Sequence, residues 1–155
     1  MDVPEVIPIR YEPDYRTDTI GHWQGGQFLA SVTAAFPEKW SGDDWPAHKR
    51  WHAILHRFDH AGRHLDSRIE FTGTTADGEQ AAIDAAGRIL DAWLDALPDR
   101  QYRDIAIAPF AVHREGCLFG LVVEHDEDDG EVEVRAELYP DNLGFYAPWD
   151  GEYDT

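Results

Sequence analysis

The chain has 155 residues and a formal net charge of −18, from 31 acidic and 13 basic side chains. Hydrophobic residues make up 43% of it, which excludes an intrinsically disordered acidic protein and allows one domain with a sizeable core. The charge argues against nucleic acid and anionic membrane as partners, and no apolar stretch approaches the ~20 residues of a membrane-spanning helix.

The negative charge is concentrated towards the C-terminal end. Residues 124–155 hold twelve of the acids and a single base, Arg135. A surface of this kind attracts cationic partners, but it also serves simply to keep a protein soluble, and both alternatives stay open. The one cysteine, Cys117, lies in an apolar run, and the first ten residues lack the basic and apolar regions of a signal peptide. We therefore expect a cytoplasmic protein.

The start of the chain predicts an extended arm followed by a strand. Residues 1–25 are punctuated by proline and glycine, which is typical of an extended N-terminal arm. Residues 26–36 then alternate between apolar and polar side chains, and Pro37 ends the pattern. This period of two predicts a half-buried strand whose apolar face carries Phe28 and Ala30.

Residues 50–72 predict a β-hairpin. The apolar residues at the start of this segment also fit helical spacing, but residues 59–63 form a turn motif and the residues after it alternate. A turn centred on Ala61 and Gly62 sets apolar residues and opposite charges across from one another, as stable cross-strand pairs require. The predicted pairs are Phe58 with Leu65, Arg57 with Asp66, Ile54 with Ile69, and His52 with Phe71.

Residues 77–97 predict the one long helix. Asp77 is a suitable N-cap, Gln80 completes a capping box, and Pro98 stops the helix. An apolar stripe at helical spacing gives this helix one face to bury. The stripe consists of Ile83, Ala86, Leu90, Trp93 and Leu97.

Three further strands are predicted over residues 102–110, 117–124 and 131–139. Short connections make neighbouring strands antiparallel, and one helix can cover one face of such a sheet. We therefore predict that residues 1–155 form a single α+β domain. It has a single antiparallel sheet of about six strands, in the order three strands, one helix, three strands, with the helix packed on one face. Residues 140–155 form an aromatic and acidic tail that we expect to pack on the domain.

No catalytic motif is present in the sequence. It has no Gly-x-Ser-x-Gly elbow, no phosphate-binding glycine loop and no His-Glu-x-x-His pattern. The acidic run at 126–130 lacks the spacing of a calcium-binding loop and is typical of a solvated turn. We therefore predict no catalytic residues, no bound metal and no cofactor.

Histidines recur at every fourth residue in the middle of the chain. They are His48, His52, His56, His60 and His64. On a helix they would form a metal-binding stripe, but residues i and i+4 of a strand lie ~13 Å apart. In the predicted hairpin His52 and His56 share the inward face. Together with Phe71 they either line a pocket on the sheet face or belong to the core as hydrogen-bonded histidines.

Acidic and aromatic side chains are the candidates for contact with a partner. Large aromatic side chains act as anchors in protein interfaces, and carboxylates select a cationic partner. The same rings could instead cap the ends of the domain's own core. The candidate residues are Trp40, Trp45, Asp126, Asp128, Asp129, Glu131, Glu133, Trp149 and Tyr153.

Four segments carry a resemblance to a known family: PDYRTDTIG at 13–21, LHRFDHAGRH at 55–64, YRDIAIAPF at 102–110 and LYPDNLGFYAPWDGEYDT at 138–155. They resemble a small actinobacterial family whose members are labelled formate hydrogenlyase regulatory protein-like. The resemblance runs over nearly the full chain and implies a regulatory protein, with no catalytic residue to carry over. In style, though not in sequence, the chain is similar to the compact acidic immunity proteins of bacteria, which block cationic toxin domains.

These observations lead to two hypotheses of function. The leading one is a non-enzymatic, acidic protein-binding module of regulatory or inhibitory type that meets a basic protein partner. The alternative is a small-molecule- or metal-binding protein, or a small enzyme, that uses the His-lined pocket on the sheet face. The sequence leaves the oligomeric state open.

Overall fold

The computed structural model describes residues 3–154 except 39, 41 and 129. The strands are β1 (Ile7–Ile9), β2 (Ile20–Trp23), β3 (Gly26–Ala35), β4 (Arg50–Phe58), β5 (His64–Thr74), β6 (Gln101–Tyr102), β7 (Ile105–Ile107), β8 (Phe110–Arg114), β9 (Cys117–Asp128), β10 (Glu131–Tyr139), β11 (Leu143–Tyr146) and β12 (Tyr153–Asp154). The helices are α1 (Trp45–His48) and α2 (Thr75–Asp95).

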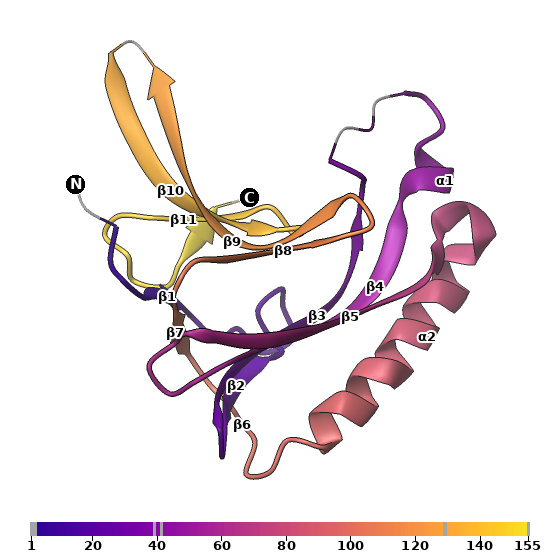
Figure 1. The fold of residues 1–155 in the computed structure, drawn as a ribbon, viewed down its shortest axis with the longest axis horizontal. Helices are drawn as coiled ribbons and strands as arrows, with labels where there is room; N and C mark the ends of the chain where they lie inside the picture. The colour runs from indigo at the N-terminus through magenta and orange to yellow at the C-terminus, as the bar shows by residue number, and fades with distance from the viewer. Residues whose placement is uncertain (1–2, 39, 41, 129, 155) are drawn as a thin grey trace.

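The strands form two five-stranded antiparallel sheets and one small sheet (Figure 1). Sheet I has the order β5-β4-β3-β2-β6, sheet II has the order β12-β11-β10-β9-β8, and β1 pairs with β7. The long helix α2 lies along one face of sheet I, and sheet II lies on the other side (Figure 1). The molecule therefore has three layers: helix, sheet I and sheet II.

The prediction of a single six-stranded sheet with one helix on one face is wrong, since the fold is mostly β and its strands divide between sheets. Strand β4 shows why. Ala53 and Leu55 pack against Leu90 of α2, whereas Ile54 points the other way and packs against Phe119 of β9. Both faces of sheet I are thus buried. Periodicity shows that a face is buried, but it does not show which element covers that face.

The segment predicted as one strand over 102–110 holds parts of three strands. Strand β6 pairs with β2 in sheet I, β7 pairs with β1, and β8 begins at Phe110 in sheet II. This stretch carries the chain from one large sheet to the other, and Pro109 separates β7 from β8. A proline donates no hydrogen bond to a ladder, which fits a position between strands.

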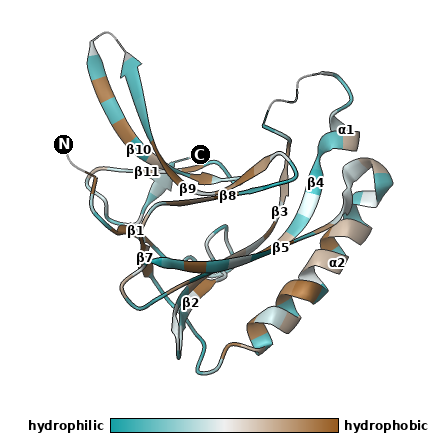
Figure 2. Cartoon of the chain, in the orientation of Figure 1, coloured by the Kyte–Doolittle hydropathy of each residue, from teal (hydrophilic) through white to brown (hydrophobic). Residues whose placement is uncertain are grey.

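Other predicted strands are confirmed. Strand β3 covers Gly26–Ala35, close to the predicted 26–36, and its Phe28 and Ala30 lie together against the helix. Strand β10 covers the predicted 131–139, and Figure 2 shows the alternating hydropathy along it. Strand β9 continues to Asp128, beyond the predicted end at 124, and forms with β10 an arm that extends past the rest of the molecule (Figure 1).

The predicted β4–β5 hairpin is confirmed, with one error in register. The pairs Arg57–Asp66, Ile54–Ile69 and His52–Phe71 are present. Phe58 faces His64 instead of Leu65, because the register shifts between Arg57 and Phe58; a second shift lies between Trp51 and His52. A bulge adds a residue to one strand, which leaves Leu65 55% exposed. Hydrophobic pairing alone could not place these bulges.

Helix α2 confirms the predicted long helix but begins earlier. Thr74 is the N-cap, with its hydroxyl accepting from the backbone N–H of Asp77, and the Asp77 carboxylate accepts from the backbone N–H of Thr74. Asp77 is therefore the third helical residue and not the predicted cap. Gly78 has a non-helical φ of 132°, a conformation that favours glycine, and forms a kink in the first turns.

Replacing Thr74 with alanine is expected to lower the free energy of unfolding by about 1 kcal/mol, since the amide of Asp77 loses its acceptor. Urea denaturation followed by circular dichroism measures the change. Thr19→Ala is the control, because among the described residues its hydroxyl donates only to the neighbouring Asp18 carboxylate. Equal stability of the wild-type and Thr74→Ala proteins would show that the capping box contributes nothing measurable.

Both terminal segments contribute to sheets. Residues 1–25 contain β1 and β2, and residues 140–155 contain β11 and β12. Leu143 and Phe145 are buried in the core that also includes Ile7 and Ile107, and Trp149 and Tyr153 pack against it. In the part of the chain that is described, no helix combines the length and apolar character needed to cross a membrane.

Candidate functional site

The outer face of sheet II is the open face of the fold. On the inner side, Phe119, Leu121, Ala136 and Leu138 are buried against sheet I and the small sheet. The residues between them in the strands point outwards, and within the described residues no helix or further strand packs over β10 and β11 on that side. Functional side chains can therefore project from this face without disturbing the core.

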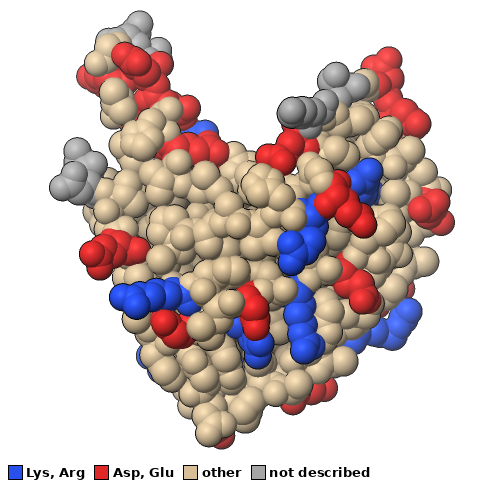
Figure 3. All heavy atoms as spheres, in the orientation of Figure 1, with Lys and Arg blue, Asp and Glu red and all other residues tan. Residues whose placement is uncertain are grey.

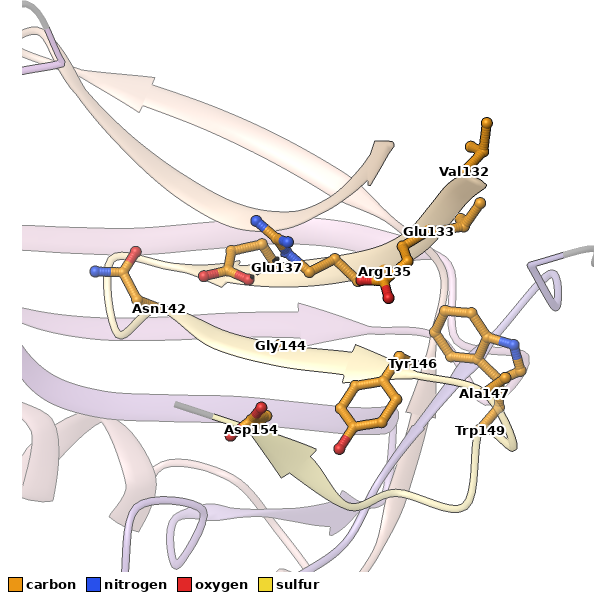
Figure 4. A pocket seen from close by; sticks show the side chains of 11 residues that line it. Val132, Glu133, Arg135, Glu137, Asn142, Gly144, Tyr146, Ala147, Trp149 and Asp154 are labelled. Atoms are coloured by element: carbon orange, nitrogen blue, oxygen red, sulfur yellow. Dashed lines mark hydrogen bonds and ion pairs between the residues drawn. The ribbon is translucent and has the colours of Figure 1, made fainter. Parts of the chain in front are cut away.

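A groove of about 660 Å³ lies on this face (Figure 4). It follows β10, β11 and β12 and the turn before β12. Its lining residues are Val132, Glu133, Val134, Arg135, Glu137, Asn142, Gly144, Tyr146, Ala147, Trp149 and Asp154. Gly144 lies in the middle of β11, opposite Glu137 on one side and Asp154 on the other, and the side chains of Glu137 and Arg135 lie close to its Cα.

Arg135 holds the carboxylates of the groove in an ordered network. Its guanidinium forms ion pairs with Glu124 at 3.3 Å, with Glu137 at 3.2 Å, and with Asp126. Glu133 lines the groove and has no ion pair in the described structure. One arginine thus stands among an excess of acids, and the groove keeps a net negative charge.

Burial, together with neighbouring charges, shifts the pKa values of Glu137 and Tyr139. Burial raises the pKa of Glu137, and the charge of Glu124 adds to this, while Arg135 opposes it. Tyr139 donates its hydroxyl to Glu124, and burial together with this contact raises its pKa to about 12. The carboxylates of the network thus lie in a partly desolvated place, where a cation is attracted more strongly than in open water.

Aromatic side chains lie beside the carboxylates in the groove, since Tyr146 of β11 is paired with Arg135 of β10. Tyr146 is 48% exposed and points outwards from β11 (Figure 4). Trp149 has a φ of 59°, which is rare for a bulky residue, and its ring packs against the core that contains Phe145. The backbone N–H of Trp149 donates to the carbonyl of Tyr146, which fixes the turn. Rings beside carboxylates suit a cationic side chain, because the face of a ring also attracts positive charge.

The structure brings some of the predicted partner-binding residues together at this groove. Glu133 and Trp149 line it, Asp126 pairs with Arg135, and Glu131 is exposed further along the arm. Tyr153 points to the inner side of β12 and packs on the core. The side chain of Asp128 and the whole of Asp129 lie outside the described residues.

The predicted tryptophans Trp40 and Trp45 lie elsewhere, in the connection between β3 and β4. The centre of the Trp40 ring lies 5.3 Å from the centre of the Phe36 ring and 5.1 Å from the centre of the His48 ring. Trp45 is 50% exposed, and Lys49 lies 5.8 Å from its ring. This connection forms a second projection beside the arm, and Figure 3 shows acidic side chains on both.

The predicted histidine pocket is filled by the core. His52 and His56 are 3% and 2% exposed, and Phe71 lies beside the His52 ring at 5.7 Å. The hydroxyl of Ser67 lies between two imidazoles, 2.6 Å from Nδ1 of His56 and 2.7 Å from Nε2 of His64. The hollow beside His56 measures about 10 Å³, too small for a ligand. Among the described residues no three His, Cys, Asp or Glu side chains gather as metal ligands would.

Sequence reasoning missed Gly144, Tyr146 and Glu137. The signal was present in β11, where Leu143 and Phe145 point inwards and the residues between and after them point outwards. Pairing of β10 with β11 sets Glu137 opposite Gly144. The pattern of the tail was too short to predict a strand without knowledge of its neighbour.

No family model, no curated protein and no solved structure matches this chain.

Proposed function

We propose that the protein is a non-enzymatic binding module whose groove on sheet II takes a basic segment of a partner protein. The observation that carries this proposal is the groove itself: a solvent-open hollow of about 660 Å³ in which the carboxylates of β10 lie beside Tyr146 and Trp149. A lysine or arginine side chain in the groove can form ion pairs with the acids and contact the ring faces beside them.

The charge of the whole chain supports the same proposal. A net charge of −18 steers cationic partners towards the protein and repels anionic ones, nucleic acids and anionic membranes among them. A regulatory or inhibitory role in the cytoplasm accords with the family resemblance described above and with the style of the immunity proteins. In this role the protein acts by covering a basic surface of its partner.

The histidine alternative is less well supported by the structure. The imidazoles of His52 and His56 are buried, and the Cys117 thiol is buried too, with its pKa raised by desolvation. A raised pKa keeps a thiol in its unreactive protonated form. Neither group is placed to meet a substrate, so the groove on sheet II is the site that we propose.

Binding of a fluorescent oligoarginine peptide, followed by anisotropy, tests the proposal. We expect the wild-type protein to bind the peptide and to lose about tenfold in affinity between low salt and ~0.5 M salt, because screening weakens the attraction. Gly144→Val is expected to weaken binding about tenfold. A Cβ on Gly144 would lie 3.2 Å from Oε2 of Glu137, and the added methyl groups would occupy the floor of the groove.

Two further variants separate the groove from the overall charge. Glu133→Gln removes a carboxylate from the groove, and Asp91→Asn removes one from the exposed side of α2, so the net charge changes equally. Only Glu133→Gln should reduce the affinity for oligoarginine. Equal losses in both variants, or equal binding of an oligoglutamate peptide, would overturn the proposal.

A further inference from the structure

Strand β5 is an open edge of sheet I. It is 11 residues long and lies at the end of the sheet, whereas β6 at the other end has 2 residues. Within the described residues β5 pairs only with β4, so the backbone groups on its other side have no strand beside them. Long open edges tend to pair with another strand, and proteins either block them or use them.

The middle of β5 is regular and carries alternating charges. Both register shifts lie near its ends, which leaves residues 66–71 as an unbroken ladder with β4. Asp66, Arg68 and Glu70 share one face, and Arg68 lies over the ring of Trp93 on α2. On the other face Ile69 is partly buried and Phe71 is 45% exposed.

We propose that two copies of the protein pair along β5, antiparallel, about a two-fold axis that passes beside Ile69. In such a pair residues equally distant from Ile69 in opposite directions face each other. Arg68 of each copy then faces Glu70 of the other, which gives two opposite-charge pairs. Phe71 faces Ser67 of the other copy, and its exposed ring becomes covered.

The charges select this register. A two-fold axis beside Arg68 would place Arg68 against its own copy and Asp66 against Glu70, and like charges directly opposite each other destabilise a sheet. An axis beside Ser67 would set Asp66 opposite Arg68 of the other copy, but Arg57 already holds Asp66 in an ion pair. The paired stretch would also include the irregular position at Leu65. The axis beside Ile69 avoids both, because Glu70 is exposed and has no ion pair in the described structure.

The strong net charge does not prevent this contact. Figure 3 shows basic and acidic side chains interspersed over the body of the molecule, the side along which β5 runs in Figure 1, whereas the two projections above it are acidic. Repulsion between distant acids falls off over ~8–10 Å at moderate salt, so the local pairs decide whether the two edges meet.

Sedimentation velocity of the full chain, from micromolar to submillimolar concentration, tests this proposal. We expect the wild-type protein to approach twice the 17.6 kDa of one chain as its concentration rises. Arg68→Glu and Glu70→Arg each set like charges opposite each other in both pairs and are expected to weaken self-association at least about tenfold. The double variant Arg68→Glu/Glu70→Arg restores opposite charges and should associate again.

Mixing the two single variants gives the most specific result. In a pair of one Arg68→Glu chain and one Glu70→Arg chain, both contacts again join opposite charges, so the mixture should dimerise where each variant alone does not. Arg88→Glu, on the exposed side of α2, is the control for charge reversal and should behave as the wild type. A wild-type protein that stays at the mass of one chain at every concentration overturns the proposal, as does a mixture that does not associate.

Discussion

Lowering the pH from about 7 to about 5 is expected to destabilise the protein by about 2 kcal/mol through His56 alone. His56 is almost fully buried, and desolvation, with the nearby His64, lowers its pKa from 6.5 to about 3. In the unfolded chain the same imidazole takes up a proton near its ordinary pKa. Between these two pKa values the unfolded state binds more protons, so stability falls as the pH falls, by up to about 1.4 kcal/mol per pH unit.

Other titrating groups add to this loss of stability or oppose it. Burial lowers the pKa values of His52 and His64 as well, so both add to the loss on acidification. Asp141 acts in the opposite sense, since burial raises its pKa above the ordinary 3.8, and it favours the folded state as the pH falls towards that value. The histidines therefore dominate between about pH 6.5 and about pH 5.

Urea denaturation of the wild type and of His56→Gln across this pH range measures the effect. The glutamine keeps a polar group near the Ser67 hydroxyl but does not titrate, so the stability of the variant should depend less steeply on pH. His125→Gln, at an exposed position on β9, is the matched control and should keep the wild-type dependence. The same steepness in His56→Gln as in the wild type would show that His56 is not the group responsible.

Phe119→Ala is expected to lower the free energy of unfolding by about 3–5 kcal/mol. The Phe119 side chain is fully buried between the two large sheets, in one cluster with Ala35 and Ile54 of sheet I. Its ring also meets the His52 imidazole edge-on, with the ring centres 5.1 Å apart. Removal of the ring leaves a cavity where sheet II rests on sheet I, and the stability of a whole domain is commonly only about 5–15 kcal/mol.

Urea denaturation monitored by tryptophan fluorescence and by circular dichroism tests this expectation. Phe36→Ala is the control, because Phe36 is 41% exposed and contacts Trp40 at the surface. A loss below about 1 kcal/mol in Phe119→Ala would mean that the two sheets are joined chiefly elsewhere. Two separate transitions would mean that the sheets unfold independently of each other.

The elements with a strong local pattern could be predicted from the sequence. The long helix, the β4–β5 hairpin and β10 follow from periodicity and charge pairing within short segments. The stacking of sheet II on sheet I could not, because it depends on contacts such as Ile54 with Phe119 between distant parts of the chain. Val132 shows the same difficulty: it alternates like Ala136, yet it is 61% exposed because it lies on the projecting arm.

Part of the candidate site could also be predicted. Acidic residues of the arm and Trp149 were expected to meet a partner, and Glu133 and Trp149 do line the groove. The groove itself depends on β11 lying next to β10 with a glycine at its centre. That arrangement requires the pairing of Glu137 with Gly144, which no local pattern specifies.

The layered construction separates the requirements of folding from those of recognition. Residues of β3 and β4 are enclosed on two sides, so a change of volume there disturbs two neighbours at once. Residues that face outwards from β10 and β11 have no second layer of the described chain packed over them, so a change of volume there does not disturb the core. Mutational tolerance should therefore differ sharply between adjacent residues of one strand, and altered ligand preference could evolve on this surface while the scaffold beneath it keeps its stability.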